Sequence, residues 1–179
     1  MTEAPDALRA IWRAQLVELR AYPYAAVGVE CAEVNTASGV TVRFRAHEVI
    51  GSPLETYGLQ IEESSCSAGG EDTRGRTVVT FAAPLDRIEL CWRDEWAEPY
   101  TEQHRTVGSS PIAVTTGPVG GAPKGIDGTT VLCGVVLQTE PPSSQFVLIY
   151  VSDYPGLISW TCDTREIAAY RTGVTCEFL

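Results

Sequence analysis

Residues 131–162 decide the fold and read VLCGVVLQTEPPSSQFVLIYVSDYPGLISWTC. Three of their runs, 131–137, 146–151 and 157–162, are rich in β-branched and aromatic residues, and two groups of turn residues separate them. This pattern predicts three consecutive strands that pair in an antiparallel way. The middle run, 146–151, is apolar at almost every position, so we expect it to be a central strand covered on both faces.

Further strands are expected before and after this stretch. Residues 40–46 alternate apolar and polar side chains, a period of two that is typical of a strand with one face in the core. Other strands are expected near residues 27–31, 57–62, 77–82, 87–92, 112–114 and 174–179. We therefore predict an α+β fold of about eight strands, mostly antiparallel, in a barrel-like or two-layer arrangement.

An amphipathic helix is predicted at residues 7–21. Leu8, Ile11 and Leu19 belong to a set of apolar residues that recur at helical spacing, and charged residues lie off that stripe. Pro23 ends the helix, because the residue before a proline is pushed out of helical geometry.

A second, short helix is predicted near the C-terminus. Asp163 can cap its first turn, and Glu166 follows three residues later, as in a capping box. Ile167 and Tyr170 are expected to face inward, and Gly173 ends the helix.

The chain is expected to form a single domain over residues 1–179. Residues 106–128 are rich in glycine and proline and are expected to form a linker or surface loop. Two β sub-units at 25–104 and 129–179 are an alternative within this domain, although the two halves share few identical residues.

The net charge of −10, from 13 basic and 23 acidic side chains, argues against nucleic-acid binding by a basic patch and disfavours anionic membranes. It either keeps the protein soluble or attracts a basic partner. No apolar run approaches the roughly 18 residues of a membrane helix. The acidic start at residues 1–6 does not resemble a secretory signal, so we expect a cytoplasmic protein.

The six cysteines show no C-x-x-C pairing, which argues against zinc-ribbon and thioredoxin-like sites. Cys31, Cys133, Cys162 and Cys176 each continue an apolar strand face, so small buried hydrophobic residues are expected there, with structural disulfides as the alternative. The chain has two histidines, which excludes a three-histidine metal site. We predict neither a metal nor a cofactor.

The main candidate for a binding site is the aromatic–acidic segment, residues 92–104. Aromatic side chains supply contact area and carboxylates supply complementarity to a basic surface. The candidate partner-binding residues are Trp92, Asp94, Glu95, Trp96, Glu98, Tyr100 and Glu102. Alternatively, the tryptophans anchor a loop in the core while the acidic side chains remain solvated.

A second candidate is a small-molecule site. Arg43, Arg45 and His47 are expected on the outward face of one strand, where they form a basic stripe for an anionic ligand. Cys66 lies in the polar loop 63–75 and would complete such a site at the mouth of a barrel.

We expect the chain to be a small, acidic, non-catalytic binding protein that acts through protein–protein interaction. An immunity-type or inhibitor protein that masks a basic partner has this composition. The alternatives are a ligand-binding β-barrel or enzyme that uses the basic stripe and Cys66, and a subunit of a symmetric assembly that pairs through an exposed strand edge. Catalysis is the less expected activity, because no catalytic constellation is recognisable.

Overall fold

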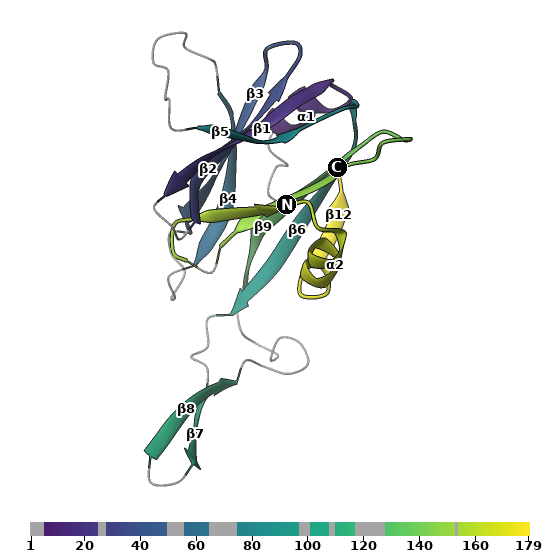
Figure 1. Cartoon of the computed structure of the whole chain (residues 1–179). Helices are drawn as coiled ribbons and strands as arrows, with labels where there is room; N and C mark the ends of the chain where they lie inside the picture. Colours follow the sequence, from purple (N-terminus) through teal and green to yellow (C-terminus); the bar gives the residue numbers. More distant parts are fainter. Residues whose placement is uncertain are drawn as a thin grey trace.

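The computed structural model describes residues 6–24, 28–49, 56–64, 75–96, 101–107, 110–116, 128–152 and 154–179. Within these residues the chain forms twelve strands and two short helices (Figure 1). The elements in chain order are α1 (Asp6–Ile11), β1 (Leu16–Tyr24), β2 (Gly28–Thr36), β3 (Thr41–Glu48), β4 (Tyr57–Ser64), β5 (Arg76–Thr80), β6 (Leu85–Trp96), β7 (Thr101–Val107), β8 (Ser110–Thr116), β9 (Gly128–Thr139), β10 (Phe146–Val151), β11 (Ile158–Thr161), α2 (Thr164–Arg171) and β12 (Thr175–Phe178).

Ten strands form one curled, half-barrel sheet in which the neighbouring strands pair antiparallel (Figure 1). Its order is β12-β6-β9-β10-β11-β2-β1-β5, and β3 and β4 continue outward from β2. Among the described residues, β2 and β11 meet at one pair, Val29 opposite Ile158. The curl packs β4 against β9 across the core. The mostly antiparallel α+β fold predicted from the sequence is confirmed.

The predicted meander is confirmed as β9, β10 and β11, which pair in sequence order. β10 is covered on both faces, as its apolar run indicates. Val147 and Ile149 lie in the main core, whereas Leu148 lies in a second, smaller core beneath α2. β9 and β10 therefore contribute side chains to both cores.

Helix α2 covers this second core. The Asp163 side chain accepts a hydrogen bond of 2.7 Å from the backbone N–H of Arg165, which caps the helix as predicted. Ile167 is only 2% exposed and packs with Leu148 and Val136. In Figure 1 the helix lies beside β6 and β12.

The predicted helix at residues 7–21 is wrong beyond Ile11, because α1 ends there and β1 begins at Leu16. Arg13 has φ 59°, a left-handed conformation that interrupts the helix. Leu16 and Leu19 suggest helical spacing because they are three residues apart. A shift in register between Leu16 and Glu18 changes the alternation of β1, so both leucines reach the core from a strand.

The structure has more strands than the eight predicted. β7 and β8 form a hairpin in a two-stranded sheet of their own, which Figure 1 draws apart from the large sheet. β8 spans Ser110–Thr116 and is therefore longer than the strand expected at residues 112–114. It lies within the region 106–128, which the sequence predicts to be a linker or surface loop. The division into two sub-units, 25–104 and 129–179, stays a prediction.

Candidate functional site

The aromatic–acidic segment begins as regular strand. β6 continues through Trp96 and pairs with β9 to its end, with Asp94 opposite Thr130. Trp92 is half-buried, and its indole N–H donates a hydrogen bond of 2.7 Å to Glu177 Oε1 on β12.

The rest of the segment follows this strand. Glu95 and Trp96 are the last residues of β6, and Glu102 lies on β7. The predicted partner residues Glu98 and Tyr100 lie outside the described residues. The sheet therefore fixes the start of the segment, and its predicted role in binding stays a prediction.

This segment is one of two acidic stretches of the chain, the other being residues 62–72. The side chains that the structure describes include thirteen carboxylates and ten arginines, so that part of the molecule is nearly balanced. Residues 94–104 carry four carboxylates and no lysine or arginine. These carboxylates give the segment a negative potential, which attracts cationic groups.

One of the three residues of the predicted basic stripe is already paired with a carboxylate of the fold. Arg43, Arg45 and His47 alternate along β3 as expected, and the last two are exposed. The Nε of Arg43 donates a hydrogen bond of 2.7 Å to Glu33 Oε1, and its Nη2 contacts the same oxygen. Cys66 lies outside the described residues, so its position relative to the stripe stays a prediction.

Glu33 joins Arg43 to Tyr22. Its carboxylate is 7% exposed and accepts a hydrogen bond of 2.7 Å from the Tyr22 hydroxyl. Burial, together with the hydrogen bond to Glu33, raises the pKa of Tyr22 to about 12. The carboxylate thus has a cation and a phenol as partners, which is how a buried charge is usually stabilised.

The structure also reveals a cluster of three thiols beneath α2, formed by Cys91, Cys133 and Cys176. Cys176 lies directly opposite Cys91 in the β6–β12 ladder, and their Sγ atoms are 3.8 Å apart. Cys133 is the extra residue of a bulge in β9, between the residues that pair with Cys91 and Trp92. Its thiol donates a hydrogen bond of 3.2 Å to the Cys91 carbonyl.

Tyr170 of α2 lies over the thiol cluster. Its hydroxyl donates a hydrogen bond of 3.1 Å to Cys133 Sγ, and its ring centroid is 5.1 Å from that of Tyr150. Both Tyr170 and Cys91 have a raised pKa, and burial is the main cause in each case. Both groups therefore stay protonated near neutral pH.

An ion pair lies beside the thiol cluster. Arg171 Nε donates a hydrogen bond of 3.1 Å to Glu89 Oε1, and its Nη2 contacts Oε2. Glu89 is 6% exposed, so the arginine compensates a nearly buried charge. Within the described part of the chain, no group of three or more histidine, cysteine, aspartate or glutamate side chains is arranged to hold a metal ion.

The cysteine predictions are partly confirmed. Cys31 and Cys133 are buried, as expected, and Cys176 is half-buried. The expectation for Cys162 is wrong, since this residue is exposed. Its strand, β11, ends at Thr161, which places Cys162 in the connection to α2. The five cysteines described are free thiols.

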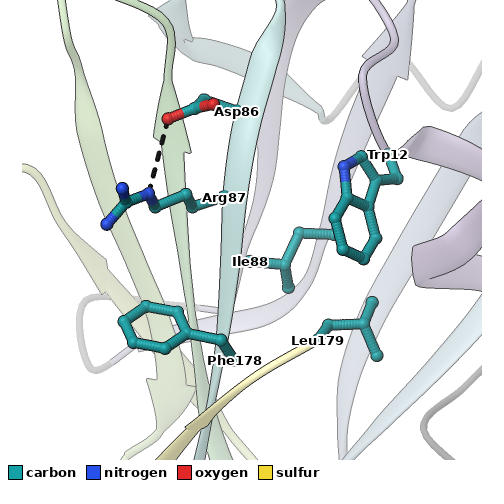
Figure 2. A pocket seen from close by; sticks show the side chains of 6 residues that line it. All are labelled: Trp12, Asp86, Arg87, Ile88, Phe178 and Leu179. Carbon is teal, nitrogen blue, oxygen red and sulfur yellow. Dashed lines mark ion pairs between the residues drawn. The ribbon is translucent and has the colours of Figure 1, made fainter.

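A shallow pocket of about 160 Å³ lies at the β12 edge of the sheet (Figure 2). Phe178 is 68% exposed, and the guanidinium of Arg87 lies 6.0 Å from its ring centroid. Arg87 also pairs with Asp86 at 3.6 Å. The lining residues are Trp12, Asp86, Arg87, Ile88, Phe178 and Leu179. This volume is below the roughly 300 Å³ of a site for a drug-sized molecule.

Sequence reasoning missed the thiol cluster and the pocket. Cys91, Cys133 and Cys176 are distant from one another in sequence. Only the register in which β6 pairs with β9 and β12 brings the three thiols together. Trp12 lies within the helix predicted at residues 7–21, and Phe178 lies within the strand expected at residues 174–179. Register is not readable from composition, and the sequence contains no motif that signals these contacts.

Comparison with known proteins supplies no family: no family model, no curated protein and no solved structure matches the chain. Among the described residues, neither helix is long and apolar enough to cross a membrane.

Proposed function

We propose that the chain is a non-catalytic binding protein that docks a basic protein partner on its aromatic–acidic segment. The observation that carries this proposal is the combination of charge with aromatic side chains: residues 92–104 hold four carboxylates, one arginine and three large aromatic residues, next to a nearly balanced body. An inhibitor or immunity-type role, in which the segment masks a basic site on the partner, is the form of this function that we favour. A cytoplasmic location is part of the same proposal.

The β6 strand supports the proposal by holding the start of the segment in place. Eleven residue pairs join β6 to β9, and the Trp92 indole is bonded to Glu177. A preformed strand loses little conformational entropy when a partner binds. Tryptophan and tyrosine are the residue types that most often dominate the energy of an interface, and carboxylates steer a basic partner toward it.

The pairing of other charged groups supports a role without catalysis. Glu33 is occupied by Arg43 and Tyr22, and Glu89 is occupied by Arg171. Each of these carboxylates is already paired within the fold, which suits a structural role better than acid–base chemistry.

The test compares two immobilised variants with the wild-type chain. In the first, Asp94, Glu95, Glu98 and Glu102 are changed to lysine. In the matched control, four exposed glutamates of the body are changed to lysine instead, namely Glu30, Glu48, Glu63 and Glu140. Proteins retained from a lysate of the source organism are identified by mass spectrometry, purified and titrated calorimetrically against all three chains.

We expect a retained protein with a basic surface whose affinity falls at least about tenfold in the segment variant and much less in the control. Raising NaCl from roughly 50 to 200 mM should weaken wild-type binding, because screening acts on exposed charges. Equal affinities for the two variants, or binding insensitive to salt, would contradict the proposal.

The two alternatives have less support. A small-molecule site at the basic stripe would have to compete with Glu33 for Arg43, and the pocket described above lies elsewhere, at the β12 edge. A symmetric assembly has end strands available, since β4, β5 and β12 terminate the sheet within the described residues. Light scattering at high protein concentration tests the assembly, and a monomer would argue against it.

A further inference from the structure

We propose that Cys91 and Cys176 are a redox modification site: a hydroperoxide oxidises them to an intramolecular disulfide that ties β12 to β6. The inference is independent of the proposed binding function. It rests on the β6–β12 ladder, in which the two cysteines are direct cross-strand partners, and on the 3.8 Å between their Sγ atoms. Both thiols are free.

The ladder brings the two side chains within reach of a bond. Cβ atoms of directly opposite residues in an antiparallel pair are about 4.5–5.5 Å apart, and a disulfide needs about 3.5–4.5 Å. The required approach is therefore on the order of 1 Å. β12 has four residues and ends the sheet, so it can make this approach without disturbing a further strand among those described.

The third thiol is engaged elsewhere. Cys133 donates a hydrogen bond to the Cys91 carbonyl and accepts one from the Tyr170 hydroxyl. Cys176 instead directs its thiol to Cys91 Sγ. The directly opposed position and the 3.8 Å between the Sγ atoms favour Cys176 as the partner of Cys91.

The reaction balances with the hydroperoxide as oxidant. Cys176 is half-buried and Cys91 is fully buried, so the oxidant reaches Cys176 first. With hydrogen peroxide, Cys176 Sγ attacks one oxygen, the O–O bond breaks, and a sulfenic acid and one water form. Cys91 Sγ then attacks Cys176 Sγ while its thiol proton passes to the departing oxygen, so the S–O bond breaks and a second water leaves. The two thiols lose two hydrogens and two electrons, which reduce the peroxide to water.

The disulfide would constrain the C-terminal part of the chain. It closes a loop from residue 91 to residue 176, which contains β9, β10, β11 and α2. Long loops lose the most entropy in the unfolded state when they are closed. Oxidation should therefore raise the melting temperature by roughly 5–15 °C, and dithiothreitol should reverse the rise.

Tryptic mapping tests the assignment directly. The reduced full-length chain is treated with hydrogen peroxide, remaining thiols are alkylated, and the protein is digested without reduction. Trypsin releases Cys91 in peptide 88–93 and Cys176 in peptide 172–179, whereas Cys133 falls in peptide 125–165. We expect peptides 88–93 and 172–179 joined, with a mass two hydrogens below their sum, as the main product.

Two variants separate this pair from the rest of the thiol cluster. Cys176→Ser should abolish the joined peptide and the rise in melting temperature, and its half-buried position makes it the less disruptive of the two partners. Cys133→Ser should leave both intact. The inference is overturned if the two peptides remain alkylated, if Cys91 pairs with Cys133, or if peroxide produces sulfinic acid or cross-linked chains instead.

Discussion

Tyr170 packs against Gly134 so closely that a Cβ atom at residue 134 would lie 2.8 Å from the tyrosine oxygen and 3.1 Å from a ring carbon. The glycine lets α2 approach the bulged part of β9, and this approach brings the tyrosine hydroxyl to Cys133. The absence of a side chain at Gly134 of β9 therefore allows α2 to pack in its observed position.

Gly134→Ala should consequently lower the free energy of unfolding by about 1–3 kcal/mol, because the Tyr170 ring must move and lose its hydrogen bond. Urea unfolding measures this change. Gly173→Ala is the matched control: a Cβ there comes no closer than 3.8 Å to its nearest neighbour, and we expect a change within about 0.5 kcal/mol. Equal losses in the two variants would contradict this account of Gly134.

Tyr22 should make stability depend on pH in the alkaline range. Its pKa rises from 10.0 to about 12 on folding, so the folded state binds the phenolic proton more tightly than the unfolded state does. The resulting stabilisation is complete below pH 10 and is lost as the pH rises toward 12. The wild-type chain should therefore lose more stability than Tyr22→Phe over this window in parallel urea titrations. Identical pH profiles for the two chains would refute the role of Tyr22.

Arg43 and Arg45 should differ in their effect on stability, although both lie on the same face of β3. Arg43→Gln leaves the nearly buried Glu33 without its cation, and we expect a loss of roughly 2–3 kcal/mol, below the ~3–5 kcal/mol of a fully buried pair. Arg45 is exposed, and Arg45→Gln should change stability by less than about 0.5 kcal/mol. Chemical denaturation of both variants measures the difference, and adding Glu33→Gln should recover part of the loss from Arg43→Gln.

Ile167 should be essential to the docking of α2, and Phe178 should not be essential to stability. Ile167 is 2% exposed in the second core, so Ile167→Ala should cost about 2–5 kcal/mol. Phe178 is largely exposed, and Phe178→Ala should cost less than about 1 kcal/mol. Thermal unfolding of the two variants provides the comparison, and a larger loss for Phe178→Ala would mean that the β12 edge is better packed than its exposure indicates.

The parts of the fold that could be predicted are those set by local pattern. The all-apolar run of β10 indicated two covered faces, and the acidic cap at Asp163 indicated α2; both are confirmed. The error at the N-terminus has a local origin as well. Leu16 and Leu19 have the spacing of one helical turn, and only the register shift with β2 shows that a strand can place both in the core.

The site residues depend on contacts between distant segments, which a single sequence does not encode as a pattern. Arg43 was correctly placed on the outer face of β3, but its partner Glu33 lies on the neighbouring strand. Cys91 and Cys176 meet only because β12 pairs with β6 in one particular register. A shift of one residue would move Cys176 away from Cys91 and turn it to the opposite face.

Among the described residues, Val29 opposite Ile158 is the single ladder pair between β2 and β11, and Gly28 permits Leu157 to approach closely. Within the described part of the chain, side chains of the main core add to the contact between the two halves of the sheet at this junction. Conditions that weaken apolar contacts should let this junction open while the β6–β9 and β9–β10 ladders remain closed. Native-state hydrogen exchange would then detect a partly separated species, with early exchange at the junction and protection retained in the meander.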